Sequence, residues 1–496
     1  MKFHRFFQKK TIVSIENESN SGVLKRTLGP WNLISLGIGC IIGTGIFVLT
    51  GQEAAIHAGP AIVISFIFAG LASCFAALCY AELASVLPVS GSAYTYAYAS
   101  LGEIFAWIMG WLLILEYGAA SSTVAVGWSG YVVSFLHNIG VTIPPEYTKA
   151  HGEIIKLVDG TTVTGIFNVP AALGVLAVSA LLVKGVKESA NVNNFIVFIK
   201  LAVILSFIGI GAFYVHPSNW HPFIPDNTGT DGEYGYSGVL KAAGVIFFAY
   251  IGFEAVSTAA QESKSPQKDI PIGILGSLTI CTILYILVSL VLTGIMSYKD
   301  LNVPDPIAVA VDHIGLPWFS IMVKIGAIMG LSSVMLVLVY GQTRIFFAMS
   351  RDGLIPSLFC KVHPKLQTPY INTIIVGLIV AFAAGMLPLS DLSHVVSVGT
   401  LLAFSIICFS VMYLRWKEPH VKRPFKVPLY PVVPYLGIAS CLYLISGIYE
   451  TIWNLKYYFI AGLVIYLSYG QFKSKLTVEG PSQADDIPEK VIKKRK

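Results

Sequence analysis

The chain alternates between long apolar stretches and shorter polar or charged ones. About twelve apolar stretches are long enough to cross a hydrocarbon core, which requires roughly 20 helical residues each. They are 30–50, 60–86, 103–136, 169–186, 192–214, 238–261, 271–296, 316–348, 371–388, 392–415, 431–449 and 453–471. The pattern predicts an all-α polytopic membrane protein with about twelve transmembrane helices.

Composition supports this class and excludes several others. Hydrophobic residues make up 55% of the 496 residues and charged residues only 12%, and the mean hydropathy of +0.71 is far from that of a soluble globular chain. Six of the seven cysteines lie inside apolar stretches and none has the spacing of metal ligands, so we expect no metal and no cofactor. The chain has no phosphate-binding glycine loop and no convincing pairing of nucleophile and base, which argues against an ATP-driven pump and against an enzyme.

Lysine and arginine residues are unevenly distributed between alternate loops. If the N-terminus is cytoplasmic, the loops on the other side keep only four of the lysines: Lys149, Lys156, Lys299 and Lys456. Cytoplasmic loops carry an excess of such residues. We therefore expect a multi-pass protein of the plasma membrane with both termini, 1–29 and 472–496, in the cytoplasm. The net charge of +6 then reflects topology and not nucleic-acid binding.

The first span contains poor helix formers at its centre. It reads "GCIIGTGIF" over 39–47, with Gly43 and Gly45 around Thr44, about 13 residues or ~20 Å into the helix and near the midplane. One interpretation is a packing face of small residues. The other is an interrupted helix, which a membrane tolerates only where the break faces protein or a watery cavity.

The sixth span has a similar feature at mid-depth. It reads "GVIFFAYIGFEAVSTAAQE", with Gly252 followed two residues later by Glu254. The first and sixth spans run in opposite directions, and each opens a block of five. Interruptions at matching positions of two halves point to an inverted-repeat secondary transporter with its substrate between the breaks. The predicted repeats are 30–214 and 238–415, followed by two peripheral helices within 431–471.

Several stretches resemble the amino acid, polyamine and organocation transporter superfamily. They are "LKRTLGPWNLISLGIGCIIGTGIFVLTG" (24–51), "GSAYTYAYASLGEIFAWIMGWLLILEY" (91–117) and "FFAYIGFEAVSTAAQESKSPQKDIPIGI" (247–274). The stretches "SRDGLIPSLFCKVHPKLQTPY" (350–370) and "RPFKVPLYPVVPYLGI" (423–438) are most similar to its cationic amino acid transporter branch, whose animal members have fourteen spans. The resemblance implies a leucine-transporter-type fold with a 5+5 inverted repeat, discontinuous first and sixth helices, and import of amino acids.

A zwitterionic substrate would need both kinds of backbone group that two broken helices expose. The half-helix that restarts after Gly43 offers free amides at Thr44 and Gly45 and the positive end of its dipole to a carboxylate. Glycines leave the backbone open to close approach. The resemblance implies that the α-ammonium binds backbone carbonyls of both unwound segments. These are the carbonyl of Ile41 in the first span and those of Phe248 and Ile251, which precede Gly252 in the sixth span.

Aromatic side chains and one glutamate flank these proposed binding groups. Phe247, Phe248, Tyr250 and Phe253 either form an occluding lid or simply pack at helical spacing. Glu116 lies about 13 residues into the third span, ~20 Å deep, where it would either bind a cationic substrate side chain or act as a structural partner of Tyr117 or a lysine.

Five further positions within the spans are candidates for structural or coupling roles. Glu82 lies near the cytoplasmic end of the second span, where we expect a solvated or capping role. By resemblance to proton-coupled members, Lys200 of the fifth span would point between the first and eighth helices, where sodium-coupled relatives hold a cation; the alternative is a static clamp. Glu254 is the other candidate proton carrier. Ser332 and Ser333 would line the same site or form an interhelical hydrogen bond.

These features favour a proton-coupled symporter that imports amino acids by alternating access. We expect cationic or small neutral L-amino acids as substrates, with protons and the lipid bilayer as the other partners; no protein partner is evident. An amino acid exchanger and a non-transporting amino acid sensor on the same fold are the alternatives.

Overall fold

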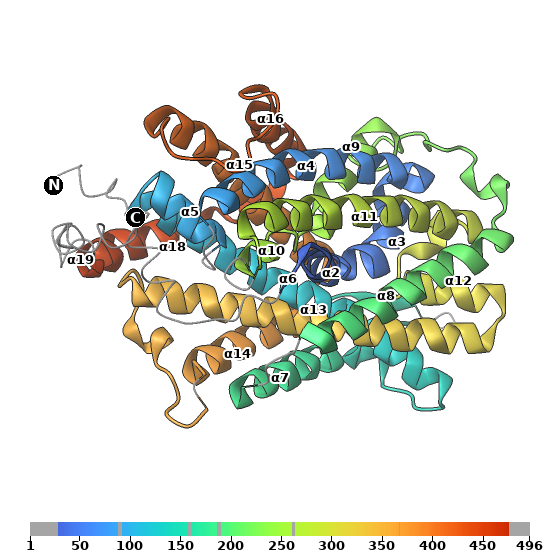
Figure 1. The fold of residues 1–496 in the computed structure, drawn as a ribbon. Coiled ribbons are helices and arrows are strands. Elements are labelled where there is room, and N and C mark those ends of the chain that lie inside the picture. The colour runs from blue at the N-terminus through green and yellow to red at the C-terminus, as the bar shows by residue number, and fades with distance from the viewer. Residues whose placement is uncertain are drawn as a thin grey trace, which may run out of the picture.

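A computed structural model describes residues 28–87, 92–156, 161–185, 190–259, 263–366 and 368–475. The predicted cytoplasmic segments 1–29 and 472–496 lie mostly outside these ranges. The described chain is mainly helical, and it forms one elongated bundle in which most helices run along the same direction (Figure 1).

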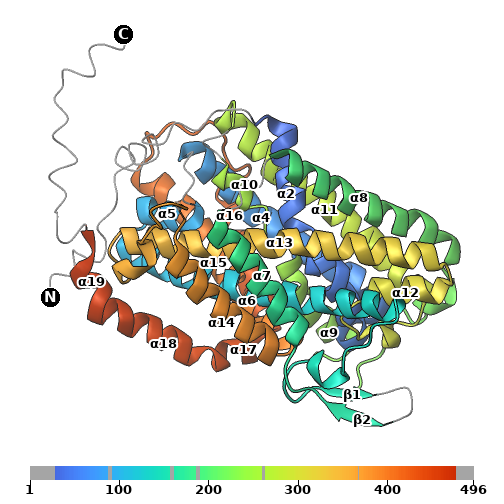
Figure 2. The ribbon, with the colours of Figure 1, turned by 90° about the horizontal axis from the view of Figure 1, so that it is seen from below.

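The principal helices follow the order of the predicted spans. They are α2 (Pro30–Ile41), α4 (Ile62–Val86), α6 (Glu103–Asn138), α7 (Val169–Lys184), α8 (Ala190–Gly211), α9 (Gly235–Ile246), α11 (Pro266–Ile295), α13 (Pro317–Arg351), α14 (Tyr370–Met386), α15 (Leu389–Lys417), α16 (Val432–Ser446) and α18 (Lys456–Ile465). Shorter helices are α3 (Thr50–Glu53), α5 (Ser92–Ser100), α10 (Ala255–Thr258), α12 (Pro306–Ile314), α17 (Tyr449–Asn454) and α19 (Gln471–Lys473). The strands β1 (Ile154–Lys156) and β2 (Thr162–Thr164) pair antiparallel, with Ile155 opposite Val163, and project from the bundle (Figure 2).

Each of the twelve predicted stretches contains helix. Within the described chain, seven helical segments are long and apolar enough to cross a membrane: Gly45–Val86, Glu103–Asn138, Asn194–Tyr214, Gly235–Ser257, Pro266–Ile295, Pro317–Arg351 and Leu389–Lys417. Four shorter apolar helices accompany them, namely α2, α7, α14 and α16. The chain is therefore a polytopic helical membrane protein.

Local sequence explains where several of these helices begin and end. Asn168 caps α7 by accepting a hydrogen bond from the Ala171 amide at 3.1 Å, and α7 stops before Gly185, which has a left-handed conformation. The first span was expected to end near 50, but helical structure continues to Ala58. The chain then reverses direction at Gly59. The φ angle there is +59°, a conformation in which a residue with a side chain would be strained.

Several early helices of the chain pack against later ones. Helix α4 packs on α11, α6 on α13, and α7 on α14. Helix α2 lies in the middle of the bundle, in contact with α11 and α8 (Figure 1). Large apolar side chains are exposed around the periphery, among them Leu173, Phe198 and Leu378. Such extensive apolar exposure is typical of a surface that contacts lipid.

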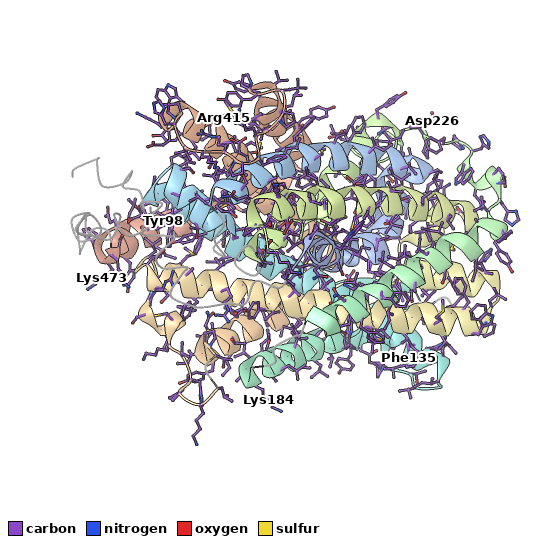
Figure 3. The ribbon with its side chains drawn as sticks, in the orientation of Figure 1. Tyr98, Phe135, Lys184, Asp226, Arg415 and Lys473 are labelled. Atoms are coloured by element: carbon purple, nitrogen blue, oxygen red, sulfur yellow. The ribbon has the colours of Figure 1, made fainter. Side chains whose placement is uncertain are left out.

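The two ends of the bundle differ in the elements that they carry. Helices α5 and α19 lie at one end, and α12 lies at the other (Figure 1). Figure 3 shows Lys184, Arg415 and Lys473 toward the α19 end, with Phe135 and Asp226 toward the α12 end. Neither α5 nor α12 was expected from the hydrophobic pattern. These two ends of the bundle are called the α19 end and the α12 end from here on.

Candidate functional site

The first broken helix consists of α2 and the helical segment 45–58. Helical hydrogen bonding stops where the Ile42 amide bonds to the Ile38 carbonyl at 2.9 Å, and it resumes where the Phe47 amide bonds to the Gly43 carbonyl at 3.3 Å. Ile42 itself is extended, with φ −71° and ψ 97°. The amides that begin the second segment therefore have no intrahelical partner, and the break lies at the glycines where the sequence predicted it.

Thr44 adds a polar side chain to this break. Its side chain is 1% exposed, and its hydroxyl oxygen has no hydrogen-bond partner within the described residues. A buried hydroxyl without a partner costs free energy that a bound ligand can recover. The break thus presents free amides and an unsatisfied hydroxyl at one place.

The second broken helix consists of α9, the turn Phe247–Tyr250 and α10. Ile251 is extended, with φ −60° and ψ 141°, and Gly252 has φ +118°, a conformation that side chains rarely adopt. A Cβ atom on Gly252 would lie 2.7 Å from the carbonyl carbon of Cys40. The two breaks are therefore in direct contact, and glycine is required there for both conformation and space.

Gly43 and Gly45 differ in the space around them. A Cβ atom on Gly45 would lie 2.6 Å from the Cα atom of Ala249, whereas one on Gly43 would lie 3.3 Å from a methyl group of Val334. Gly45 therefore permits contact between the two broken helices. At Gly43 a methyl group would require only a shift of a few tenths of an ångström in the Val334 side chain, so Gly43 is the better position for testing access to the backbone.

We expect Gly43→Ala to fold normally but to weaken amino acid binding. An added methyl group would obstruct hydrogen bonds from the backbone amides to a carboxylate, and charge-assisted bonds are worth about 1.5–3 kcal/mol, or roughly tenfold to 150-fold in the dissociation constant. Gly45→Ala should instead lower the melting temperature, since overpacking costs about 1–3 kcal/mol. Calorimetric binding and thermal unfolding of both variants would measure this; unchanged affinity in Gly43→Ala would contradict the site assignment.

Two of the three predicted ammonium-binding carbonyls already have a partner. The Phe248 carbonyl accepts the Ile251 amide at 3.1 Å. The Ile41 carbonyl lies 2.9 Å from the Tyr285 hydroxyl, which also lies 2.6 Å from the Ala249 carbonyl. A carbonyl has a second lone pair, so a substrate ammonium could still bind. Tyr285 of α11 thus joins the two breaks, a role that sequence reasoning missed although a tyrosine inside an apolar span was a usable signal.

Lys200 of α8 reaches the first broken helix from the side. Its side chain is fully buried, and its Nζ atom donates to the carbonyls of Gly39 at 2.8 Å and Ile42 at 3.2 Å. These carbonyls belong to the last turn of α2, where the helix dipole favours a cation. The stem packs against Gly330 of α13, whose Cβ would lie 3.1 Å from Lys200 Cε. The ammonium thus lies beside the first broken helix, with its stem against α13.

Two buried carboxyl groups that interact electrostatically lie near the second break. Glu254 is 2% exposed, accepts the Gly252 amide at 2.8 Å, and lies within hydrogen-bonding reach of Tyr117. Glu116 of α6 is 1% exposed and close enough to Glu254 for electrostatic interaction. Two like charges in a dry site cannot both ionise easily.

The carboxyl group of Glu116 has no counterion among the described residues. Neither of its oxygens has a hydrogen bond of good geometry there. The Thr400 hydroxyl is close enough to interact with the carboxyl group, but it is oriented to donate to the Val396 carbonyl at 3.0 Å. The alternative of a structural pair with a lysine therefore finds no support within the described chain. The carboxyl group of Glu116 can therefore take up a proton or bind a cationic ligand.

The remaining candidates occupy different positions. Ser332 accepts from Trp128 at 2.9 Å and donates to Ile328 at 2.7 Å, so it makes the interhelical hydrogen bond that was the alternative interpretation. Ser333 is 5% exposed, in the same helix. Glu82 is not solvated as expected: it is 2% exposed and pairs with Arg415, with 2.8 Å between Oε1 and Nε. The Oε2 atom of Glu82 accepts a hydrogen bond from the Val427 amide at 2.7 Å. This bond anchors the loop after α15.

Three of the four aromatic side chains of the proposed lid pack into the bundle. Phe247 contacts the ring of Phe404 with centroids 5.6 Å apart, and Phe253 lies 5.1 Å from the same ring. The Tyr250 hydroxyl donates to the Phe66 carbonyl at 2.8 Å. Phe248 has no aromatic partner among the residues described here, and it remains the best candidate for contact with substrate.

Comparison with known proteins identifies the family. The amino acid permease family matches residues 28–466. The methylthioribose transporter of Bacillus subtilis (strain 168) is 47% identical over 471 residues, covering 95% of this chain and 99% of the relative. The branched-chain amino acid permease BcaP of the same organism is 48% identical over 473 residues, covering 95% and 98%. The vacuolar cationic amino acid transporter 4 of Arabidopsis thaliana is 36% identical over 417 residues, covering 83% and 67%. The chain therefore belongs to the amino acid permease family of the amino acid, polyamine and organocation superfamily, and it is a membrane transporter and not an enzyme.

Proposed function

We propose that this protein is a proton-coupled symporter that imports amino acids by alternating access. The observation that carries the proposal is the bond between the buried Lys200 ammonium and two carbonyls at the break of the first helix. In sodium-coupled relatives of this fold, a bound sodium ion would lie in this region. Here the Lys200 ammonium takes that place and supplies the positive charge. Loss of its proton would remove charge-assisted hydrogen bonds worth about 1.5–3 kcal/mol each and release the α2 half of the helix.

The proposed topology places the α19 end in the cytoplasm. It has twelve spans, with inverted repeats 30–214 and 238–415 and peripheral helices within 431–471. The packing of α4 on α11, α6 on α13 and α7 on α14 supports such a repeat, because a two-fold relation places equivalent helices together. The basic residues Lys184, Arg415 and Lys473 toward the α19 end (Figure 3) support cytoplasmic termini in the plasma membrane.

The proposed substrates are small neutral and cationic L-amino acids. The free amides and the Thr44 hydroxyl suit a carboxylate, and relatives are named for branched-chain and cationic amino acids. The unpaired Glu116 would bind a guanidinium or ammonium side chain. Methylthioribose is a second candidate because a relative of 47% identity is named for it, although that sugar has no carboxylate or amine for the two breaks to bind.

Uptake by purified protein in liposomes tests the proposal. We expect labelled alanine or arginine to accumulate when the outside is more acidic than the lumen, with no change when choline replaces sodium. Competition by unlabelled amino acids and by methylthioribose would rank the substrates. Counterflow without net uptake would indicate an exchanger, and binding without either would indicate a sensor. Strong stimulation by sodium would refute proton coupling.

A further inference from the structure

A second group of buried titratable side chains lies at the α12 end, away from Lys200, Glu116 and Glu254. Glu53 of α3 is 3% exposed, and its Oε2 atom has no hydrogen-bond partner within the described residues. The Nε2 atom of His57 lies 3.9 Å from this oxygen. The two residues are four positions apart on the outer part of the first broken helix.

His57 also holds the loop 225–235 against this helix. Its Nδ1 atom lies 2.7 Å from the Gly232 carbonyl. Its own carbonyl accepts the Tyr234 amide at 2.9 Å, and the Tyr234 hydroxyl donates to the Ala55 carbonyl at 2.5 Å. The Gly232 carbonyl of the loop therefore orients the His57 ring. The backbone carbonyls of His57 and Ala55 in turn hold the loop through Tyr234.

The partner of Nδ1 determines which nitrogen carries hydrogen. A carbonyl oxygen only accepts, so Nδ1 must carry a proton. In a neutral ring, Nε2 then bears a lone pair, and that lone pair faces the Glu53 carboxyl group. A carboxylate opposite a lone pair in a buried place is unfavourable. One proton, on either Nε2 or the carboxyl group, turns the contact into an attractive pair.

Charged groups on neighbouring elements limit the pair to one proton. Lys241 of α9 acts electrostatically on both residues. Its stem packs against Gly232, where an added Cβ atom would lie 3.3 Å from Lys241 Cε. His394 of α15 and Glu233 of the loop also act on His57 or lie beside it. Adding a second proton would leave a net cation next to Lys241. Without any proton, the pair is an anion that attracts Lys241 away from the loop.

We propose that Glu53 and His57 form a proton-binding site at the external end of the first broken helix, and that the singly protonated pair holds the loop 225–235 closed over it. Loss of the proton turns the Glu53 carboxylate toward Lys241. Movement of the lysine stem removes the packing beneath Gly232, and the loop opens. The site is separate from the coupling residues proposed above, and its test does not depend on transport.

Hydrogen exchange of the loop amides, Tyr234 above all, tests this inference on substrate-free protein. The exchange rate divided by the intrinsic chemical rate gives the opening equilibrium. We expect the opening equilibrium constant to rise with pH within the range from about pH 5 to 8, by about threefold to tenfold per pH unit where the pair titrates. Tenfold per pH unit is the largest slope that release of one proton can give. Glu53→Gln keeps the shape and can donate to Nε2 at every pH, so its corrected exchange should be flat.

Three further variants make the outcome decisive. Asp226→Asn removes an exposed charge from the same loop (Figure 3) and should keep the wild-type pH response. Tyr234→Phe removes the bond to Ala55 and should raise exchange equally at all pH values, which shows that the measurement detects loop opening. His57→Gln should also abolish the pH response, and it serves if Glu53→Gln does not fold. A flat wild-type profile, or a wild-type slope in Glu53→Gln, would overturn the proposal.

Discussion

Replacing Lys200 with methionine should abolish the stimulation of uptake by an inward proton gradient, a change on the order of tenfold or more. Methionine keeps much of the apolar stem that packs on Gly330 but cannot carry charge. It removes two hydrogen bonds to the Gly39 and Ile42 carbonyls, each worth about 1.5–3 kcal/mol. We expect exchange of substrate at equal pH on both sides to continue, because only the proton-linked return of the empty carrier is impaired.

Lys324 provides a matched control for this experiment. It is also buried in the bundle, at 1% exposure, but it pairs with Asp312 at 2.9 Å toward the α12 end. Lys324→Met should therefore keep the wild-type dependence of uptake on pH. An intact pH response in Lys200→Met liposomes would rule out the proposed role of Lys200 and make Glu254 the next proton carrier to test.

Replacing Glu116 with glutamine should weaken binding of arginine or lysine by about 1–3 kcal/mol, or roughly fivefold to 150-fold, and leave alanine nearly unaffected. The carboxyl oxygens have no hydrogen bond of good geometry and no counterion among the described residues, so a cationic side chain would satisfy them. Competition for labelled alanine in liposomes measures both affinities under one condition.

Glu254→Gln is the informative comparison for Glu116→Gln. Glu254 already accepts the Gly252 amide at 2.8 Å, which a glutamine oxygen can replace, so substrate ranking should change little. If Glu116→Gln instead weakens arginine and alanine equally and removes the response to pH, the residue holds a proton shared with Glu254. Equal losses without a change in pH response would assign Glu116 a structural role.

The positions of the two helix breaks were predictable from the sequence. Counting residues placed Gly43, Glu116 and Gly252 near the midplane, because each helical residue advances a fixed 1.5 Å. Glycines within apolar spans also indicated both interruptions, since a break in lipid needs special backbone positions and a protected environment. The structure has helix breaks at those places. The charged residue Glu82 was the exception: its position near a helix end favoured solvation, but Arg415, 333 positions later, buries it in an ion pair.

The sequence by itself determined the membrane class, the approximate helical stretches, the positions of the two breaks and, through its motifs, the family. These follow from the free energy of transferring each segment to lipid and from local backbone preference, which depend on residues close together in the chain. Only the tertiary structure decided that Lys200 bonds to Gly39 and Ile42, that Tyr285 joins the breaks, and that Glu53 faces His57 beneath the loop at Gly232. Most of these contacts join residues far apart in sequence, and they depend on how each helix is rotated and tilted, which the packing of the whole bundle fixes.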